Sequence, residues 1–155
     1  DPYLPESAWP GLARRAPDLG PALAQADAVS LHLPRADRPV LGAAELAALK
    51  PGAIVVNTAR GGLLDEAALA AALRSGHLGG AGIEVFGAEP PGPDHPLFGL
   101  DQAVLTPHNA ALTVECAERM ALASVQNVLD FFAGTLDPAL VVNRAALGGI
   151  KEPAK

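Results

Sequence analysis

Short apolar segments alternate with helical patterns along this chain, and this alternation limits the available folds more than any other feature. The segment AIVVNT at 53–58 is β-branched and apolar at successive positions, as expected of a parallel strand covered on both faces. Comparable segments are AVSLHL at 28–33, AGIEVF at 81–86 and AVLT at 103–106. We predict that these four segments are strands of one sheet.

Helical patterns separate the predicted strands. GAAELAALK at 42–50 indicates one helix, which ends before Pro51 because proline lacks the backbone N–H that a helix needs. The next helix lies in DEAALAAALRSG, with Asp65 as its N-terminal cap and Gly76 just beyond its C-terminus. Strands and helices that alternate in this way are typical of a doubly wound α/β layer around a parallel sheet.

The last long helix is predicted from about Thr113 to Gly134. Its apolar residues recur at helical spacing on one face, and charged residues largely avoid that face. The face is formed by Val114, Ala117, Ala121, Val125, Val128 and Phe132. We therefore divide the chain into a partial α/β domain over 1–112 and a long helix with a tail over 113–155.

One expected element is missing from the start of the chain. A dinucleotide-binding sheet normally carries G-x-G-x-x-G between its first strand and first helix. No such sequence opens this chain, which begins with Asp1-Pro2-Tyr3. We therefore expect the chain to begin partway through a domain, with the first βα unit absent and the sheet incomplete.

Charge and cysteine content narrow the classes of function. The chain has 155 residues, a net charge of −6 and no basic cluster, so we predict no nucleic-acid partner. No apolar run is long enough to cross a bilayer, so we predict no membrane partner. The single Cys116 excludes an internal disulfide, and the N-terminal sequence does not resemble a secretory signal. We therefore expect a reducing, cytoplasmic setting.

Three polar residues stand where predicted strands run into loops. Arg60 follows the strand at 53–58, and its guanidinium can bind a carboxylate through paired, charge-assisted hydrogen bonds. Glu89 lies in a loop stiffened by prolines, which hold a side chain in place at little entropic cost. His108 follows the strand at 103–106 and can give or take a proton near neutral pH. Ligands bind at the carboxyl ends of parallel strands, so this set points to an enzyme of small organic acids.

The sequence allows a second interpretation for Arg60 and for Glu89. It also allows two interpretations for another acid, Glu84. Arg60 could instead pair with Asp65 or Glu66 at the start of the next helix. Glu89 could be a solvated loop acid. Glu84 interrupts the apolar segment IEVF, so it lies either on a polar rim or against a ligand.

The other histidines are assigned separately. His32 lies within an apolar segment and is expected to be a hydrogen-bonded core or backbone-positioning residue. His77 lies in a turn after a helix and His95 in the proline-rich loop, and we expect both at the surface. No two histidines have the i, i+4 spacing of a helical metal pair, so we predict no metal site.

Taken together, these motifs make the chain similar to the C-terminal half of the D-isomer-specific 2-hydroxyacid dehydrogenases. The resemblance runs from Asp1 to about Asn143. It is carried by SLHLP at 30–34, LKPGAIVVNTARGGLLDEAAL at 49–69, AGIEVFGAEPP at 81–91 and TPHNAALT at 106–113. It implies a nicotinamide-dependent oxidoreductase with two Rossmann-like domains, usually dimeric, in which the segment over 113–155 returns to the substrate domain.

The resemblance also implies roles for the three polar residues. Arg60 matches the arginine that binds the carboxylate and carbonyl of the substrate. His108 matches the histidine that protonates the carbonyl oxygen while NADH delivers hydride, and Glu89 matches the acid that binds this histidine. A nearby carboxylate favours the imidazolium form, which suits the reduction of a 2-oxo acid.

Cofactor contacts are implied in the same way. Asp1 matches an acid that binds the adenosine ribose hydroxyls, which favours NAD over NADP because a carboxylate would repel a 2′-phosphate. The remaining implied cofactor-binding residues are His32, Leu33, Pro34, Thr58, Ala59, Arg60, Glu84, His108 and Ala110. Two positions depart from the family: Glu84 replaces the usual aspartate that contacts the nicotinamide carboxamide, and Pro39 replaces a common threonine.

The expected function is therefore the NAD-dependent interconversion of a small D-2-hydroxy acid and its 2-oxo acid, by a cytoplasmic homodimer. Formate dehydrogenases share the fold but have glutamine where this chain has Glu89. An NAD(H)-sensing corepressor and a scaffold without catalysis remain alternatives. Which 2-hydroxy acid is used stays open. We expect these 155 residues alone to bind NADH poorly and to have no useful turnover.

Overall fold

The computed structural model describes residues 5, 8, 11 and 13–144. The chain divides into two compact units, Asp1–Ala110 and Ala111–Lys155. Asp1, which the resemblance assigns to ribose binding, lies outside the described residues.

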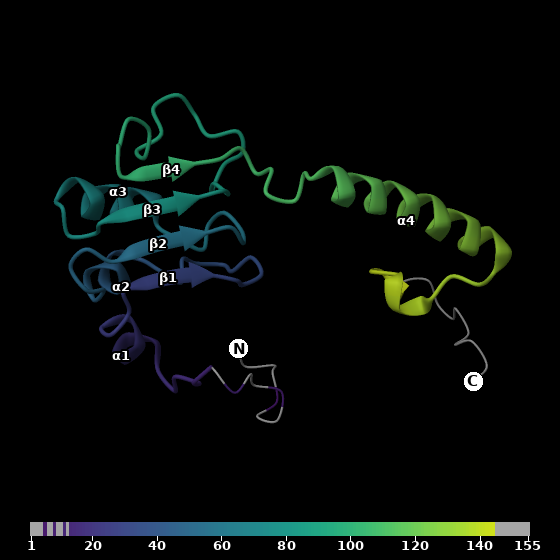
Figure 1. The fold of residues 1–155 in the computed structure, drawn as a ribbon, viewed down its shortest axis with the longest axis horizontal. Helices are drawn as coiled ribbons and strands as arrows, with labels where there is room; N and C mark the ends of the chain where they lie inside the picture. Colours follow the sequence, from purple (N-terminus) through teal and green to yellow (C-terminus); the bar gives the residue numbers. More distant parts are fainter. Residues whose placement is uncertain (1–4, 6–7, 9–10, 12, 145–155) are drawn as a thin grey trace. The chain divides into compact units, whose positions relative to one another are not determined.

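A parallel sheet forms the centre of the first unit (Figure 1). Its strands are β1 (Ala28–Leu31), β2 (Ile54–Asn57), β3 (Gly80–Ile83) and β4 (Ala103–Leu105), and they lie side by side in that order. The register aligns the last residues of all four strands, Leu31, Asn57, Ile83 and Leu105. This confirms the predicted parallel α/β fold and its incomplete, Rossmann-like sheet.

The strands are shorter than the sequence predicts, and the difference changes the place of two polar residues. β1 ends at Leu31, so His32 lies just beyond the strand, where it is exposed and contacts the Ser30 hydroxyl at 2.8 Å. The prediction that His32 lies within a core strand was therefore wrong. β3 ends at Ile83, so Glu84 begins the loop that follows.

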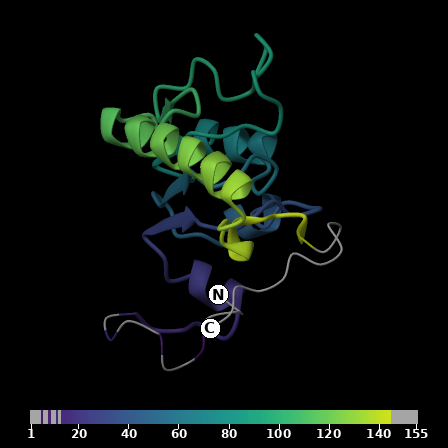
Figure 2. The same cartoon turned by 90° about the vertical axis from the view of Figure 1, so that its right-hand side faces the viewer.

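Helices connect the first three strands. β1 leads through α2 (Ala43–Ala47) to β2, and β2 leads through α3 (Glu66–Arg74) to β3. Parallel connections are right-handed, so two steps in the same direction place both helices on one face of the sheet. Figure 2 shows α2 and α3 side by side, and their residues are in contact. A short α1 (Leu19–Leu23), which the sequence did not predict, precedes β1.

The core lies between these helices and the face of the sheet that they cover. Its fully buried members include Leu41, Leu46, Leu63, Leu69, Leu73, Leu78, Ile83 and Leu97. The opposite face keeps apolar residues in contact with solvent, since Ile54 is 39% and Val104 68% exposed. The expectation of a strand covered on both faces therefore holds on one face only within the described residues.

Caps set the ends of the two longer helices as predicted. The Asp65 carboxylate accepts the Ala68 N–H at 2.9 Å and begins α3. In the second unit, α4 (Val114–Ala133) begins at the Thr113 cap and ends at Gly134, whose φ of 72° only glycine adopts freely. A 3₁₀ turn, η2 (Pro138–Leu140), follows.

Among the described residues no helix combines the length and apolar content of a membrane span.

Candidate active site

The carboxyl ends of three neighbouring strands bring the candidate residues together. Arg60 follows β2, Glu89 lies in the long loop after β3, and His108 follows β4. The strands end level with one another because of their register. Residues far apart in the chain therefore meet at one edge of the sheet, as predicted.

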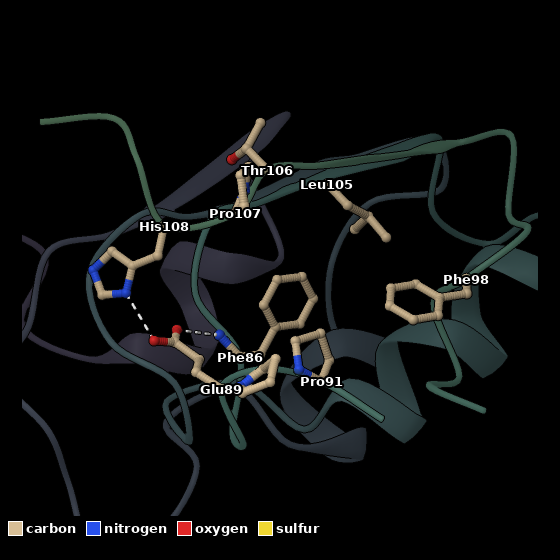
Figure 3. Close-up of a pocket in the computed structure, with 9 residues that line it drawn as sticks. Phe86, Glu89, Pro91, Phe98, Leu105, Thr106, Pro107 and His108 are labelled. Atoms are coloured by element: carbon tan, nitrogen blue, oxygen red, sulfur yellow. Dashed lines mark hydrogen bonds and ion pairs between the residues drawn. The ribbon is translucent and has the colours of Figure 1, made fainter. Parts of the chain in front are cut away.

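His108 and Glu89 form a hydrogen-bonded pair, with Nδ1 of the ring 2.8 Å from Glu89 Oε2 (Figure 3). The other carboxylate oxygen, Oε1, accepts the Phe86 N–H at 3.0 Å. An ionised carboxylate can only accept, so Nδ1 donates, and Nε2 is the ring nitrogen available to a ligand. Both side chains remain partly open to solvent, at 50% for His108 and 39% for Glu89.

Electrostatics keeps Glu89 ionised. The hydrogen bond with His108, followed by that from the Phe86 backbone, lowers the pKa of the Glu89 carboxyl below its ordinary value. The charges of His108 and Arg60 act in the same direction. Near neutral pH the ring of His108 therefore faces a permanent negative charge through Nδ1.

Arg60 sits on a turn organised by Asn57, the last residue of β2. The buried Asn57 amide donates to the Arg60 carbonyl at 3.0 Å, and its oxygen accepts the Ala59 N–H at 3.1 Å. Arg60 itself is exposed, and its Nη1 donates to the Ala59 carbonyl at 2.6 Å. Thr58 is also exposed on this turn. Asn57 was not singled out from the sequence, although a polar residue that ends an apolar strand was a usable signal.

The alternative partners of Arg60 are engaged elsewhere. Asp65 caps α3, and Glu66 hydrogen-bonds Gly87 and His95. The guanidinium is therefore not held by the acids at the start of α3, which leaves it able to bind an anionic ligand.

Gly61 brings the Arg60 turn against the loop that carries Glu89. A Cβ at this position would lie 1.8 Å from the Phe86 carbonyl oxygen, so only glycine permits the contact. The two loops and the turn after β4 enclose a pocket of about 210 Å³. Its lining residues are Arg35, Arg60, Gly61, Phe86, Gly87, Glu89 and His108. A separate hollow of about 440 Å³, walled by Phe86, Phe98 and Leu105, adjoins the Glu89–His108 pair (Figure 3).

Glu84 shapes the turn that presents His108. It is 5% exposed, and its carboxylate accepts the Ala110 N–H at 2.6 Å and the Thr106 hydroxyl. Its backbone carbonyl accepts the His108 N–H at 3.1 Å. These bonds hold His108 at a φ of 52°, a left-handed conformation that costs energy for residues other than glycine.

Those contacts bear on the role predicted for Glu84. Its carboxylate is directed to the turn over 106–110, with both oxygens engaged by protein donors. The hydrogen bond from Thr106, followed by that from Ala110, lowers its pKa. Within this structure Glu84 acts on the site through the turn, and a direct contact with nicotinamide stays a prediction.

The described residues fit part of a dinucleotide. His32, Leu33 and Pro34 are exposed at the carboxyl end of β1, where they line a hollow of about 590 Å³. The Thr58–Arg60 turn occupies the corresponding end of β2. These groups can hold one part of an extended ligand beside His108, whereas a glycine-rich phosphate loop is absent from the sequence.

Two histidines differ from expectation. His95 was expected at the surface, but its side chain is only 10% exposed and lies 2.9 Å from Glu66. Phe86 and Phe98 flank its ring, which explains the burial. His77 is half-buried and contacts the Leu46 carbonyl at 3.2 Å. Within the part of the chain that the structure describes, no cluster of three potential metal ligands is found.

Sequence comparison decides the family. Residues 3–110 match the model of a family described as D-isomer specific 2-hydroxyacid dehydrogenase, NAD binding domain. The chain belongs to this family. Its sheet is therefore part of an NAD-binding domain, as the resemblance implied.

Relatives show how much of such a protein the chain represents. It is 46% identical over 132 residues to the (S)-sulfolactate dehydrogenase of Chromohalobacter salexigens, covering 83% of this chain and 42% of that one. It is also similar to the TT0316 protein from Thermus thermophilus, with 42% identity, a TM-score of 0.74, and coverage of 83% and 43%. The NADPH-dependent glyoxylate/hydroxypyruvate reductase of Sinorhizobium meliloti gives 32% identity, a TM-score of 0.70, and coverage of 76% and 37%. The chain spans less than half the length of these relatives.

Removal of the Glu84 charge should lower stability in a pH-dependent way. Because the folded state lowers its pKa from an ordinary value of 4.5, ionised Glu84 stabilises the fold above that pH. This contribution is lost as pH falls through the folded-state pKa. We expect Glu84→Gln to lower the urea midpoint at about pH 7 and to show a smaller deficit at an acidic pH below the ordinary value of 4.5.

Glu118→Gln, on the exposed surface of α4, is the matched control and should leave the midpoint unchanged at both pH values. A Glu84→Gln deficit that stays constant on acidification would contradict the assignment, because a lost steric fit would not titrate.

Proposed function

We propose that this chain supplies the acid–base and carboxylate-binding groups of an enzyme that interconverts a small D-2-hydroxy acid and its 2-oxo acid. The observation that carries the proposal is the convergence of Arg60 with the Glu89–His108 pair in one pocket. A guanidinium and an imidazole–carboxylate pair are what the reaction needs: one group for the substrate carboxylate and one for the proton. Family membership supports the same reaction class.

Each side chain has a distinct part in the reduction. Arg60 binds the carboxylate and orients the neighbouring carbonyl. His108 donates a proton from Nε2 to the carbonyl oxygen, and a nicotinamide cofactor held by the NAD-binding domain would supply the hydride. Glu89 keeps the ring oriented through the hydrogen bond at Nδ1, which leaves Nε2 directed to the substrate. In the reverse direction the same nitrogen accepts the hydroxyl proton.

A sensing protein of the same fold is the second candidate, because a corepressor could keep the same three residues. Glu89 argues against formate chemistry, since glutamine stands there in formate dehydrogenases. We further propose that the complete protein is a cytoplasmic homodimer without a nucleic-acid or membrane partner. The acidic net charge and the family resemblance support this part of the proposal.

His108→Ala should abolish most turnover. We expect kcat to fall by about 10²- to 10⁴-fold, because the reaction loses its positioned acid–base group. The assay is NADH oxidation by the protein that carries these 155 residues, across glyoxylate, pyruvate, hydroxypyruvate and bulkier 2-oxo acids. His77→Ala, which lies after α3 and outside the pocket, is the matched control and should keep full activity. Absence of turnover with every acid, despite intact NADH binding, would favour the sensing protein.

A second arginine, Arg35, bears on which class of substrate the pocket binds. It lines the same pocket as Arg60, so two arginines border one small volume. We propose that Arg60 binds the 2-carboxylate and that Arg35 binds a second anionic group at the far end of the substrate. The relative from C. salexigens is a dehydrogenase of sulfolactate, a 2-hydroxy acid with a sulfonate as its second anion.

Arg35→Ala should therefore weaken selection for doubly anionic acids. One charge-assisted hydrogen bond is worth roughly 1.5–3 kcal/mol, so kcat/KM for sulfopyruvate should fall by roughly 10- to 100-fold. Glyoxylate, which has one anionic group, should change by less than about threefold. Arg38→Ala, from the same loop but outside the pocket, is the control. An equal loss for both acids would reject the role of Arg35.

A further inference from the structure

A second carboxylate–imidazole pair fastens the loop of Glu89 to helix α3. Glu66 is the first residue of α3, and its Oε2 lies 2.9 Å from His95 Nε2. Both side chains are largely withdrawn from solvent, at 19% for Glu66 and 10% for His95. Neither lines the pocket of Arg60 and His108. The pair is therefore built into the fold beside the site without facing a ligand there.

The second oxygen of Glu66 reaches the backbone next to the site. Oε1 accepts the Gly87 N–H at 2.7 Å, and the preceding residue, Phe86, donates its N–H to Glu89 at 3.0 Å. The Phe86 carbonyl is the group against which Gly61 packs. The Phe86–Gly87 backbone thus touches the Arg60 turn, the Glu89 carboxylate and Glu66 at once.

Two aromatic contacts and two hydrogen bonds hold the ring of His95 in place. Phe86 meets it edge-on at 5.2 Å between centroids, and Phe98 lies at 5.4 Å. The Leu97 N–H donates to Nδ1 at 3.4 Å, so Nε2 carries the hydrogen that is donated to Glu66. A neutral imidazole in this one tautomer satisfies both contacts, and the fully buried Leu97 anchors the same segment in the core.

We propose that Glu66 and His95 are positioning residues for the reaction: they fix the Phe86–Gly87 backbone, and with it the placement of Glu89 against His108. The inference rests on the proposed function, which gives Glu89 and His108 their roles. A displacement of about 1 Å at reacting groups can cost roughly 10²-fold in rate. Loss of the pair should therefore reduce kcat far more than it raises KM.

Glu66→Ala tests the proposal in the 155-residue chain by carboxyl ¹³C NMR titration. Without Glu66, the Phe86 N–H and His108 should no longer meet Glu89 in fixed geometry, so the pKa of Glu89 should rise towards its ordinary value. His95→Gln should retain the low pKa, because its amide nitrogen can still donate to Glu66. In the protein that carries this chain, Glu66→Ala should lower kcat roughly tenfold or more, with KM changed less than about threefold.

Arg74→Ala is the matched control. Arg74 lies at the other end of α3 and donates to the Pro96 carbonyl at 2.6 Å, so it ties the same loop to the same helix without touching Phe86 or Gly87. It should leave the pKa of Glu89 in place. An unchanged pKa in Glu66→Ala, or an equal rise in Arg74→Ala, would overturn the proposal.

A second variant tests the positioning role if Glu66→Ala does not fold. If circular dichroism shows that Glu66→Ala is unfolded, His95→Asn replaces it, since asparagine can accept from Leu97 but cannot reach Glu66. A raised pKa of Glu89 in that variant supports the proposal, and an unchanged one rejects it. Because the titration needs no turnover, a shifted pKa without turnover of any 2-oxo acid would reject the proposed function and keep the positioning role.

Discussion

The buried carboxylate of Glu84 is the constraint on which the rest of the site depends. A charge withdrawn from water needs donors, and the donors nearest to it are those of the turn after β4. In satisfying Glu84, that turn takes a conformation that places His108 in the left-handed region of the backbone. The ring is then presented to Glu89, so the orientation of the proposed acid–base group follows from a residue that need not contact the substrate.

The parallel sheet aligns the C-terminal ends of its strands along one edge. Because the strands end in register, the loops after β2, β3 and β4 leave the sheet at the same height. Contacts between these loops then help to set the distances among the side chains of the site. The Phe86–Gly87 backbone makes such contacts, with Gly61 on the Arg60 turn and with Glu66 on α3. The site thus combines a regular scaffold with one irregular loop whose conformation is fixed by hydrogen bonds to its neighbours.

Much of this arrangement could be predicted from local sequence, and the remainder could not, for a physical reason. The β-branched strand at β2, the Asp65 cap and the Thr113–Gly134 limits of α4 depend on residues close together in the chain. The burial of His95 depends instead on Glu66, 29 positions away, and on aromatic residues that only the fold brings beside it. His32 was misplaced because its apolar neighbours conceal where pairing with β2 stops.

The open side of the sheet bears on how the chain behaves in concentrated solution. Among the described residues, strand β1 stands at an edge of the sheet, and Ile54 and Val104 are exposed on the face away from α2 and α3. An unpaired strand edge next to uncovered apolar side chains is a template for the addition of further strands. Self-association through this side would compete with native folding at high concentration, and purification of the chain by itself would have to contend with aggregation.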